Sequence, residues 1–200
     1  SAYNFQKVFK RAVASYGIPG KLYTDNGSPY VNGQLALLCG SIGTVLLHTK
    51  VRDGASKAKI ERFWRTTKER WLYALDTEKI HSLDEFDALY QEYIRSYNTT
   101  FHSGINCSPF DRYRVSEKSV RIPVSADWLD GCFLNRIWRR VRKDSTVSID
   151  KVSFDVPMQF ISQKVEIRFL PDDLSHAFIL FEDNKFPIRI TDKNENCRTK

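Results

Sequence analysis

Two acidic residues stand where carboxylates could hold a divalent metal against a phosphodiester. Asp25 follows a short apolar segment, and Glu61 lies on a strongly basic helical pattern, with 35 residues between the two acids. Carboxylate oxygens suit Mg²⁺, which takes one or two protein carboxylates and leaves its other positions to water and phosphate oxygens. Two such ions about 3.5–4 Å apart can stabilise both the attacking and the leaving oxygen of a displacement.

Each acid also has a purely structural explanation. Asp25-Asn26-Gly27 has the composition of a simple turn. Glu61 lies one helical turn from Lys57 and from Arg65, so it could form i,i+4 ion pairs on an exposed helix. Both explanations stay open from the residues alone.

Basic residues gather around Glu61. Residues 50–70 contain eight Lys or Arg and three Asp or Glu, in a chain of formal charge +7. This concentration favours a polyanionic partner, although a solvated helix face would look the same. The candidate contacts to the partner are Lys57, Lys59, Arg62, Arg65 and Lys68 on this helix and, in a second cluster that includes Arg136 and Lys143, Arg139, Arg140 and Arg142.

Length and cysteine spacing narrow the class of protein. Two hundred residues suffice for one domain or two small ones. The sequence has no apolar run long enough to span a bilayer and no signal-peptide pattern, so we expect no membrane partner and a cytoplasmic protein. Its four cysteines are widely spaced without a CxxC pair, which argues against structural zinc and a disulfide framework and favours reduced thiols.

The first half of the chain has alternating helical and extended patterns, which is typical of an α/β fold. Periodic apolar residues predict a first helix that ends before Gly17, and the capping box at Ser82 predicts a helix to about Tyr97. His102, just beyond, could approach a phosphate or be a hydrogen-bonded structural histidine. The other predicted elements are a strand over 21–24, a short helix over 32–39, a strand over 44–48, a mobile loop over 49–55, and a helix from Ser56 that buries Ile60, Phe63, Trp64, Thr67, Trp71 and Leu75.

The second half changes to a period of two after a linker. Residues 112–135 read as a linker with one short helix over 126–130. Six short strands are predicted over 137–142, 146–149, 152–155, 164–170, 177–181 and 187–191. Regularly spaced short strands favour a small β-barrel.

The two acidic motifs together resemble those of the DDE transposase and retroviral-integrase superfamily. The matching residues are Tyr23-Thr24-Asp25-Asn26-Gly27, the 35-residue gap, and Ile60-Glu61-Arg62-Phe63-Trp64-Arg65-Thr66. Tyr97-Asn98, His102 and Ser108-Pro109 are similar to the end of that core in bacterial insertion-sequence transposases. Residues 165–174 resemble the small β-barrel that follows the core in phage Mu-type transposases.

The resemblance implies a fold, a chemistry and partners. The fold would be α/β then all-β: a partial ribonuclease-H-like core over 1–111, the linker 112–135, and a six-stranded barrel over 136–193. Asp25 and Glu61 would be the second and third catalytic acids and ligands of two Mg²⁺ or Mn²⁺ ions that serve DNA cleavage and joining. Expected partners are the element-end and target DNA, further copies of the chain, and an ATPase accessory protein, in the bacterial cytoplasm.

One member of the implied catalytic set is missing. The family's first acid precedes the first helix, but residues 1–24 contain no Asp or Glu. We therefore expect a chain that begins inside the catalytic domain and is inactive alone. Two alternatives stay open: a non-catalytic DNA-binding or assembly module derived from a transposase, and a different ribonuclease-H-like nuclease such as a junction resolvase.

Overall fold

The first helix, α1 (Ala2–Tyr16), forms where the apolar period predicts it. The Ser1 hydroxyl caps its start by accepting a hydrogen bond from the Asn4 amide, and Gly17 ends it at a φ of 89°, which glycine adopts without strain. The computed structural model describes residues 1–49, 58–116 and 119–192, so the predicted loop over 49–55 lies almost entirely outside the described residues.

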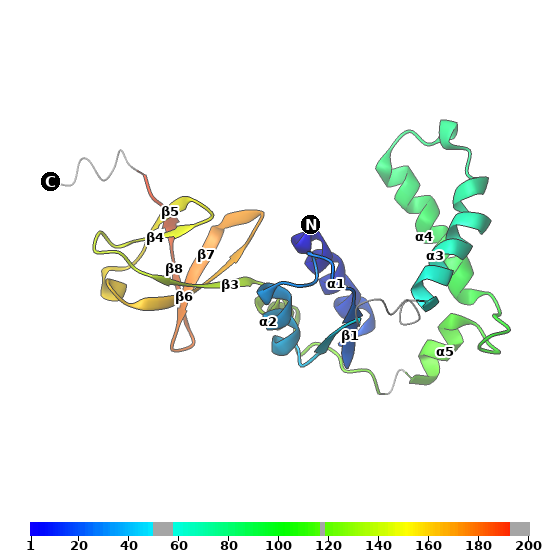
Figure 1. Ribbon diagram of the computed structural model, residues 1–200, viewed down its shortest axis with the longest axis horizontal. Coiled ribbons are helices and arrows are strands. Elements are labelled where there is room, and N and C mark those ends of the chain that lie inside the picture. Colours follow the sequence, from blue (N-terminus) through cyan, green and yellow to red (C-terminus); the bar gives the residue numbers. More distant parts are fainter. Residues whose placement is uncertain (50–57, 117–118, 193–200) are drawn as a thin grey trace. The chain divides into compact units, whose positions relative to one another are not determined.

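The described chain forms two compact units, which we treat separately. The first contains Ser1–Leu47 and Ile122–Lys200, and the second contains His48–Arg121. Figure 1 labels most of their helices and strands. The division into a core over 1–111 and a barrel over 136–193 stays a prediction.

A helical layer packs around a short sheet in the first unit. β1 (Lys21–Thr24) pairs with β2 (Val45–His48), and between them comes α2 (Gly33–Ser41), capped by the side chain of Asn32. The predicted short helix near 126–130 is α6 (Ala126–Cys132), which an ion pair of 2.8 Å between Lys10 and Asp130 links to α1. Their common core contains Phe9, Val13, Leu35, Leu38, Cys39, Ile42, Leu129, Cys132 and Phe133.

The rest of the first unit consists of two antiparallel sheets around one core. The four-stranded sheet has the order β3 (Asn135–Arg140), β6 (Lys164–Leu170), β7 (Asp173–Phe181), β8 (Asn184–Pro187). The three-stranded sheet has the order β4 (Thr146–Ile149), β5 (Val152–Asp155), β9 (Arg189–Ile190). Phe160, in the 3-10 turn η5 (Met158–Phe160), is 2% exposed and packs on Phe181 and Phe186. Residues from both sheets share the core: Val141, Val147, Ile149, Phe154, Val156, Phe160, Val165, Ile167, Phe169, Ala177, Ile179 and Ile188.

This arrangement corrects the prediction of six strands. The strand predicted over 187–191 is divided, because β8 pairs with β7 up to Pro187 whereas β9 pairs with β5 from Arg189. Proline has no N–H to donate to a ladder, so the chain can leave one sheet at this point and join the other. β7 also begins earlier than predicted, at Asp173. The described residues thus contain seven strands after α6, and a closed barrel stays a prediction.

Two polar contacts hold the helical layer on the strands. The Gln34 amide donates to the Arg136 carbonyl oxygen at 2.7 Å, and the Arg136 amide donates to Gln34 Oε1 at 2.8 Å. The Asp172 carboxylate accepts hydrogen bonds from Tyr3 Oη at 2.6 Å and from Lys7 Nζ at 2.8 Å. Burial, and then the Asp172 carboxylate, raise the pKa of Tyr3 to about 12.

The second unit is helical and packs through aromatic side chains. α3 (Ala58–Arg70) is followed by the 3-10 turns η2 (Leu72–Ala74) and η3 (Thr77–Lys79), then by α4 (Leu83–Thr99), which lies beside α3 (Figure 1). The capping box is confirmed, because Ser82 Oγ accepts from the Glu85 amide at 3.1 Å. Trp71 contacts three rings of α4, those of Phe86, Tyr90 and Tyr93, at centroid distances of 5.1–5.4 Å.

Two predictions about this unit were wrong. Ile60 and Trp64, assigned to a buried side of α3, are 51% and 48% exposed. The apolar arc of α3 is wider than the single facing helix can cover. The segment over 112–135, predicted as a linker with a helix at 126–130 alone, begins inside a further helix, α5 (Pro109–Ser116). Across the described ranges, no helix has both the length and the apolar character needed to cross a membrane.

Candidate functional site

Asp25 lies in a constrained turn at the end of β1. Thr24, the last strand residue, is buried, and Asp25 is half-buried. Asp25 Oδ1 accepts a hydrogen bond from the Gly27 amide at 2.9 Å, which is the bond of an Asx turn. A Cβ atom at position 27 would stand 2.8 Å from this oxygen, so any larger residue there would require the Asp25 carboxylate to shift. The structural explanation of Asp25 is therefore supported, and the bond to Gly27 uses one of the about four acceptor sites of an ionised carboxylate.

Glu61 lies in the first turn of α3 and is exposed. Among the residues that the structure describes, it has no cation within 4.0 Å, so the ion pair with Arg65 is not formed. Lys57, the other expected partner, lies outside the described residues.

The oxygen donors of Asp25 and Glu61 are of the type that Mg²⁺ or Mn²⁺ prefers. Asp25 belongs to the first unit and Glu61 to the second, so a metal shared between them stays a prediction. The described part of the chain has no group of three or more His, Cys, Asp or Glu residues that could hold a metal ion.

The predicted basic residues of α3 lie on two faces of the helix. At 3.6 residues per turn, Arg65 and Lys68 lie within about 40° of Glu61 around the helix axis. Lys59 and Arg62 lie on a different face, about 160° and 100° away by the same geometry. All four side chains are exposed. The cations next to the acid are therefore Arg65 and Lys68.

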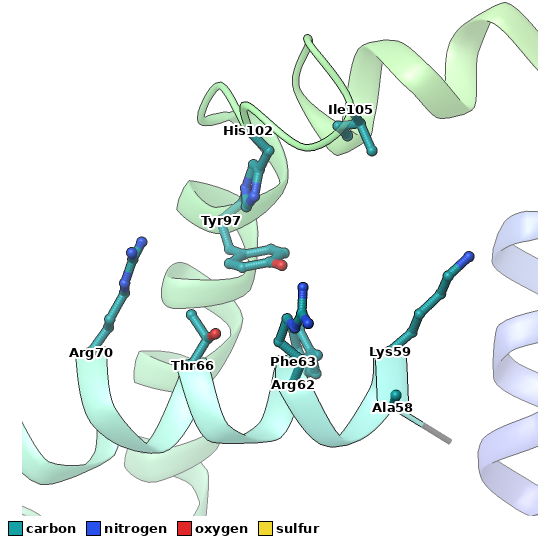
Figure 2. Close-up of a pocket in the computed structure, with 9 residues that line it drawn as sticks. All are labelled: Ala58, Lys59, Arg62, Phe63, Thr66, Arg70, Tyr97, His102 and Ile105. Carbon is teal, nitrogen blue, oxygen red and sulfur yellow. The ribbon is translucent and has the colours of Figure 1, made fainter. Parts of the chain in front are cut away.

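The second basic face of α3 lines a cavity of about 580 Å³. Figure 2 shows the side chains of α3 rising from the helix toward Tyr97 and His102. His102 Nε2 donates to the Tyr97 carbonyl oxygen at 3.0 Å, which confirms the hydrogen-bonded role expected for this histidine. The residues that line the cavity are Ala58, Lys59, Arg62, Phe63, Thr66, Arg70, Tyr97, His102 and Ile105.

The basic cluster after residue 135 does not form one stripe. Neighbouring residues of a strand point to opposite faces, so Arg139 and Arg140 are separated. Arg139 Nε donates to the Ser148 carbonyl oxygen and Arg140 Nε to that of Ser162, each at 3.1 Å. Arg142 lies beyond β3, which ends two residues earlier than predicted.

Comparisons with known proteins agree with the resemblance to transposases. Residues 130–187 match the family described as "Mu transposase, C-terminal". The chain is 24% identical over 183 residues to the transposase for transposon Tn552 of Staphylococcus aureus, with 84% of the chain and 37% of the relative aligned. It is also 24% identical over 120 residues to the transposase for insertion sequence IS1202 of Streptococcus pneumoniae, with 54% of the chain and 25% of the relative aligned.

The chain is thus similar to transposases over most of its length, and residues 130–187 match a transposase family. Its fold is similar to that of a chain in the cryo-EM structure of the simian T-cell lymphotropic virus intasome in complex with PP2A regulatory subunit B56 gamma. The TM-score is 0.50 at 16% identity, covering 96% of this chain and 65% of the other. The chain spans about a third of the length of the Tn552 relative and a quarter of the IS1202 relative.

Two features of the chain were not predicted from its sequence. Arg70 was not included among the candidate contacts, although Lys59, Thr66 and Arg70 follow one another at helical spacing. Arg136 was placed in a basic surface cluster, but this side chain is half-buried and hydrogen-bonds to Ser41 Oγ of α2. Burial, and then the neighbouring Arg168, lower the pKa of Arg136.

Proposed function

We propose that this chain is part of a DNA transposase that cuts DNA at the ends of a mobile element and joins those ends to target DNA. One observation carries the proposal: a chain whose sequence matches transposases has Asp25 at the end of β1 and Glu61 in the first turn of a cationic helix. Carboxyl ends of strands in open α/β sheets are places where ligands bind.

In this proposal the two acids are ligands of Mg²⁺ or Mn²⁺, with two ions in the complete enzyme. The bound ions supply Lewis-acid stabilisation of the phosphodiester oxygens. The turn that binds Asp25 Oδ1 to the Gly27 amide orients that carboxylate. Arg65 and Lys68, on the face of Glu61, contact phosphates and position the DNA without reading its sequence.

The proposal also covers the activity of these 200 residues on their own and the partners that they bind. With two carboxylates rather than three, they should be inactive or nearly so on their own. DNA is the proposed substrate, and a homo-oligomer on paired DNA ends is the proposed assembly. The matched relatives give no support for the ATPase partner expected from the resemblance, and it is not part of the proposal.

Strand transfer tests the role of the acids. The full-length product of the gene is mixed with pre-cut element-end DNA and Mn²⁺, and Asp25→Asn and Glu61→Gln are compared with Glu69→Gln. Glu69 is a matched control because it is another exposed carboxylate of α3. We expect both acid variants to bind DNA but lose joining, and the control to join normally.

Two results would overturn the proposal in different ways. Equal joining by all variants would remove Asp25 and Glu61 from the reaction. A wild type that binds DNA but never joins it would favour the non-catalytic DNA-binding module, which the exposed basic faces of α3 would equally serve.

A further inference from the structure

The cavity beside α3 combines cations with aromatic rings, and the acid face of the helix does not contribute to it. Lys59, Arg62 and Arg70 line it, and all three are exposed. Around the helix axis they lie about 100–180° from Glu61, so a ligand bound there would not occupy the face of the catalytic acid. All lining residues belong to the second unit.

The aromatic wall of the cavity is held in place by its own contacts. The Tyr97 ring meets that of Phe63 at a centroid distance of 5.3 Å and that of His102 at 4.5 Å, both edge to face. The bond from His102 Nε2 to the Tyr97 carbonyl oxygen fixes the imidazole against the end of α4. Ile105, 43% exposed, adds an apolar side chain on the loop that follows (Figure 2).

We propose that this cavity binds an unpaired stretch of a DNA strand, with phosphates on Lys59, Arg62 and Arg70 and a base against the wall that Tyr97 and His102 form. Single-stranded nucleic acid is bound by basic grooves in which bases stack on aromatic side chains. In duplex DNA the bases are stacked on one another, so their faces are not available to such a wall. The choice of DNA as ligand rests on the proposed function.

The prediction separates the two basic faces of α3 by the type of DNA that each binds. Each phosphate contact contributes about −0.7 to the slope of log affinity against log salt for a single strand and about −0.9 for duplex DNA. Removing two cavity cations should therefore reduce the single-strand slope by about 1.4 and leave the duplex slope unchanged. Removing two cations from the acid face should reduce the duplex slope by about 1.8.

The test is fluorescence anisotropy of the 200-residue chain with a labelled oligothymidine and with a duplex of equal length, over a series of NaCl concentrations. Arg62→Gln/Arg70→Gln is compared with Arg65→Gln/Lys68→Gln, which loses the same charge from the same helix. Equal effects of both variants on both DNA types would overturn the proposal. The cavity proposal can also fail by itself. This would be the outcome if the acid variants Asp25→Asn and Glu61→Gln lose joining, as the proposed function expects, but the cavity variant Arg62→Gln/Arg70→Gln binds single-stranded DNA as the wild type does.

Stacking is tested separately. Tyr97→Ala should weaken single-strand binding about 5- to 150-fold, whereas Tyr97→Phe, which keeps the ring, should not. Because Tyr97→Ala could unfold the unit, the wild type is also irradiated with an oligonucleotide that contains 5-iododeoxyuridine. A cross-link mapped to Tyr97 or His102 would support the proposal, and cross-links only elsewhere would overturn it. Stronger competition by a phosphopeptide than by the oligonucleotide would also overturn it.

Discussion

Gly27→Ala changes the position of the Asp25 carboxylate without removing it. The added Cβ would stand 2.8 Å from Asp25 Oδ1, about 0.6 Å closer than an ordinary contact of 3.4 Å. The carboxylate must move by about this distance or give up its hydrogen bond to residue 27, which is worth about 0.5–1.5 kcal/mol. Since a misplacement of about 1 Å can reduce a rate about 100-fold, we expect joining to fall on the order of 10-fold.

The assay is Mn²⁺-dependent strand transfer by the full-length gene product, with the thermal midpoint measured in parallel. Gly33→Ala is the matched control, because a Cβ there has no atom within 4 Å and Gly33 begins α2. The control should join at the wild-type rate. If Gly27→Ala also joins at that rate, the turn does not set the position of a catalytic carboxylate.

Three further predictions concern the first unit. Gln34→Ala removes both hydrogen bonds to the Arg136 backbone and should lower the free energy of unfolding by about 1–3 kcal/mol in urea titration, and a change below about 0.5 would contradict this. The pKa of Tyr3 is raised from 10.0 to about 12, so its stabilisation is complete below pH 10 and is lost as the pH rises to about 12. Tyr3→Phe should lack that alkaline loss, and an unchanged pH profile would show that Tyr3 is not its source. Burial raises the pKa of Cys39 to about 11, so iodoacetamide should label half-buried Cys107 before Cys39 in the native protein, as mass spectrometry would show.

Local signals allowed several elements to be predicted from sequence. Ser82 and Glu85 form the capping box that starts α4, and the apolar period of residues 5–16 gives α1. α5 was missed, although its signals were present: Ser108 Oγ accepts from the Asp111 amide at 3.0 Å, and Pro109 occupies the first helical position. A short, weakly amphipathic helix has few apolar residues to reveal a period.

The features that could not be predicted depend on contacts between residues that are distant in sequence. Trp64 has the helical spacing of a core residue, but its burial depends on how much surface the facing helix offers. The separation of Arg139 and Arg140 from Arg142 depends on where β6 stops pairing with β3. The cavity beside α3 joins residues about 40 positions apart, because Lys59 and His102 line one cavity only when α3 and α4 lie side by side.

The same dependence on distant contacts limits what the sequence alone shows about the candidate acids. Asp25 and the glycine two residues later predicted a turn, and the structure adds the close approach between position 27 and the Asp25 carboxylate. Asp25 lies in one unit and Glu61 in the other, and neither motif by itself determines whether the two acids share a metal.

The position of α6 limits how genes for proteins of this kind could exchange the segments that encode the helical layer and the strands. The family match begins at residue 130, in the middle of a helix whose cap, Ser125, lies before it. Leu129, Cys132 and Phe133 pack into the helical core with α1 and α2, while the strands that follow have a core of their own. A recombination that transferred the strands from residue 130 onward would divide α6 and expose this apolar face. Inheritance of α1, α2, α6 and the strands as one block would preserve both cores.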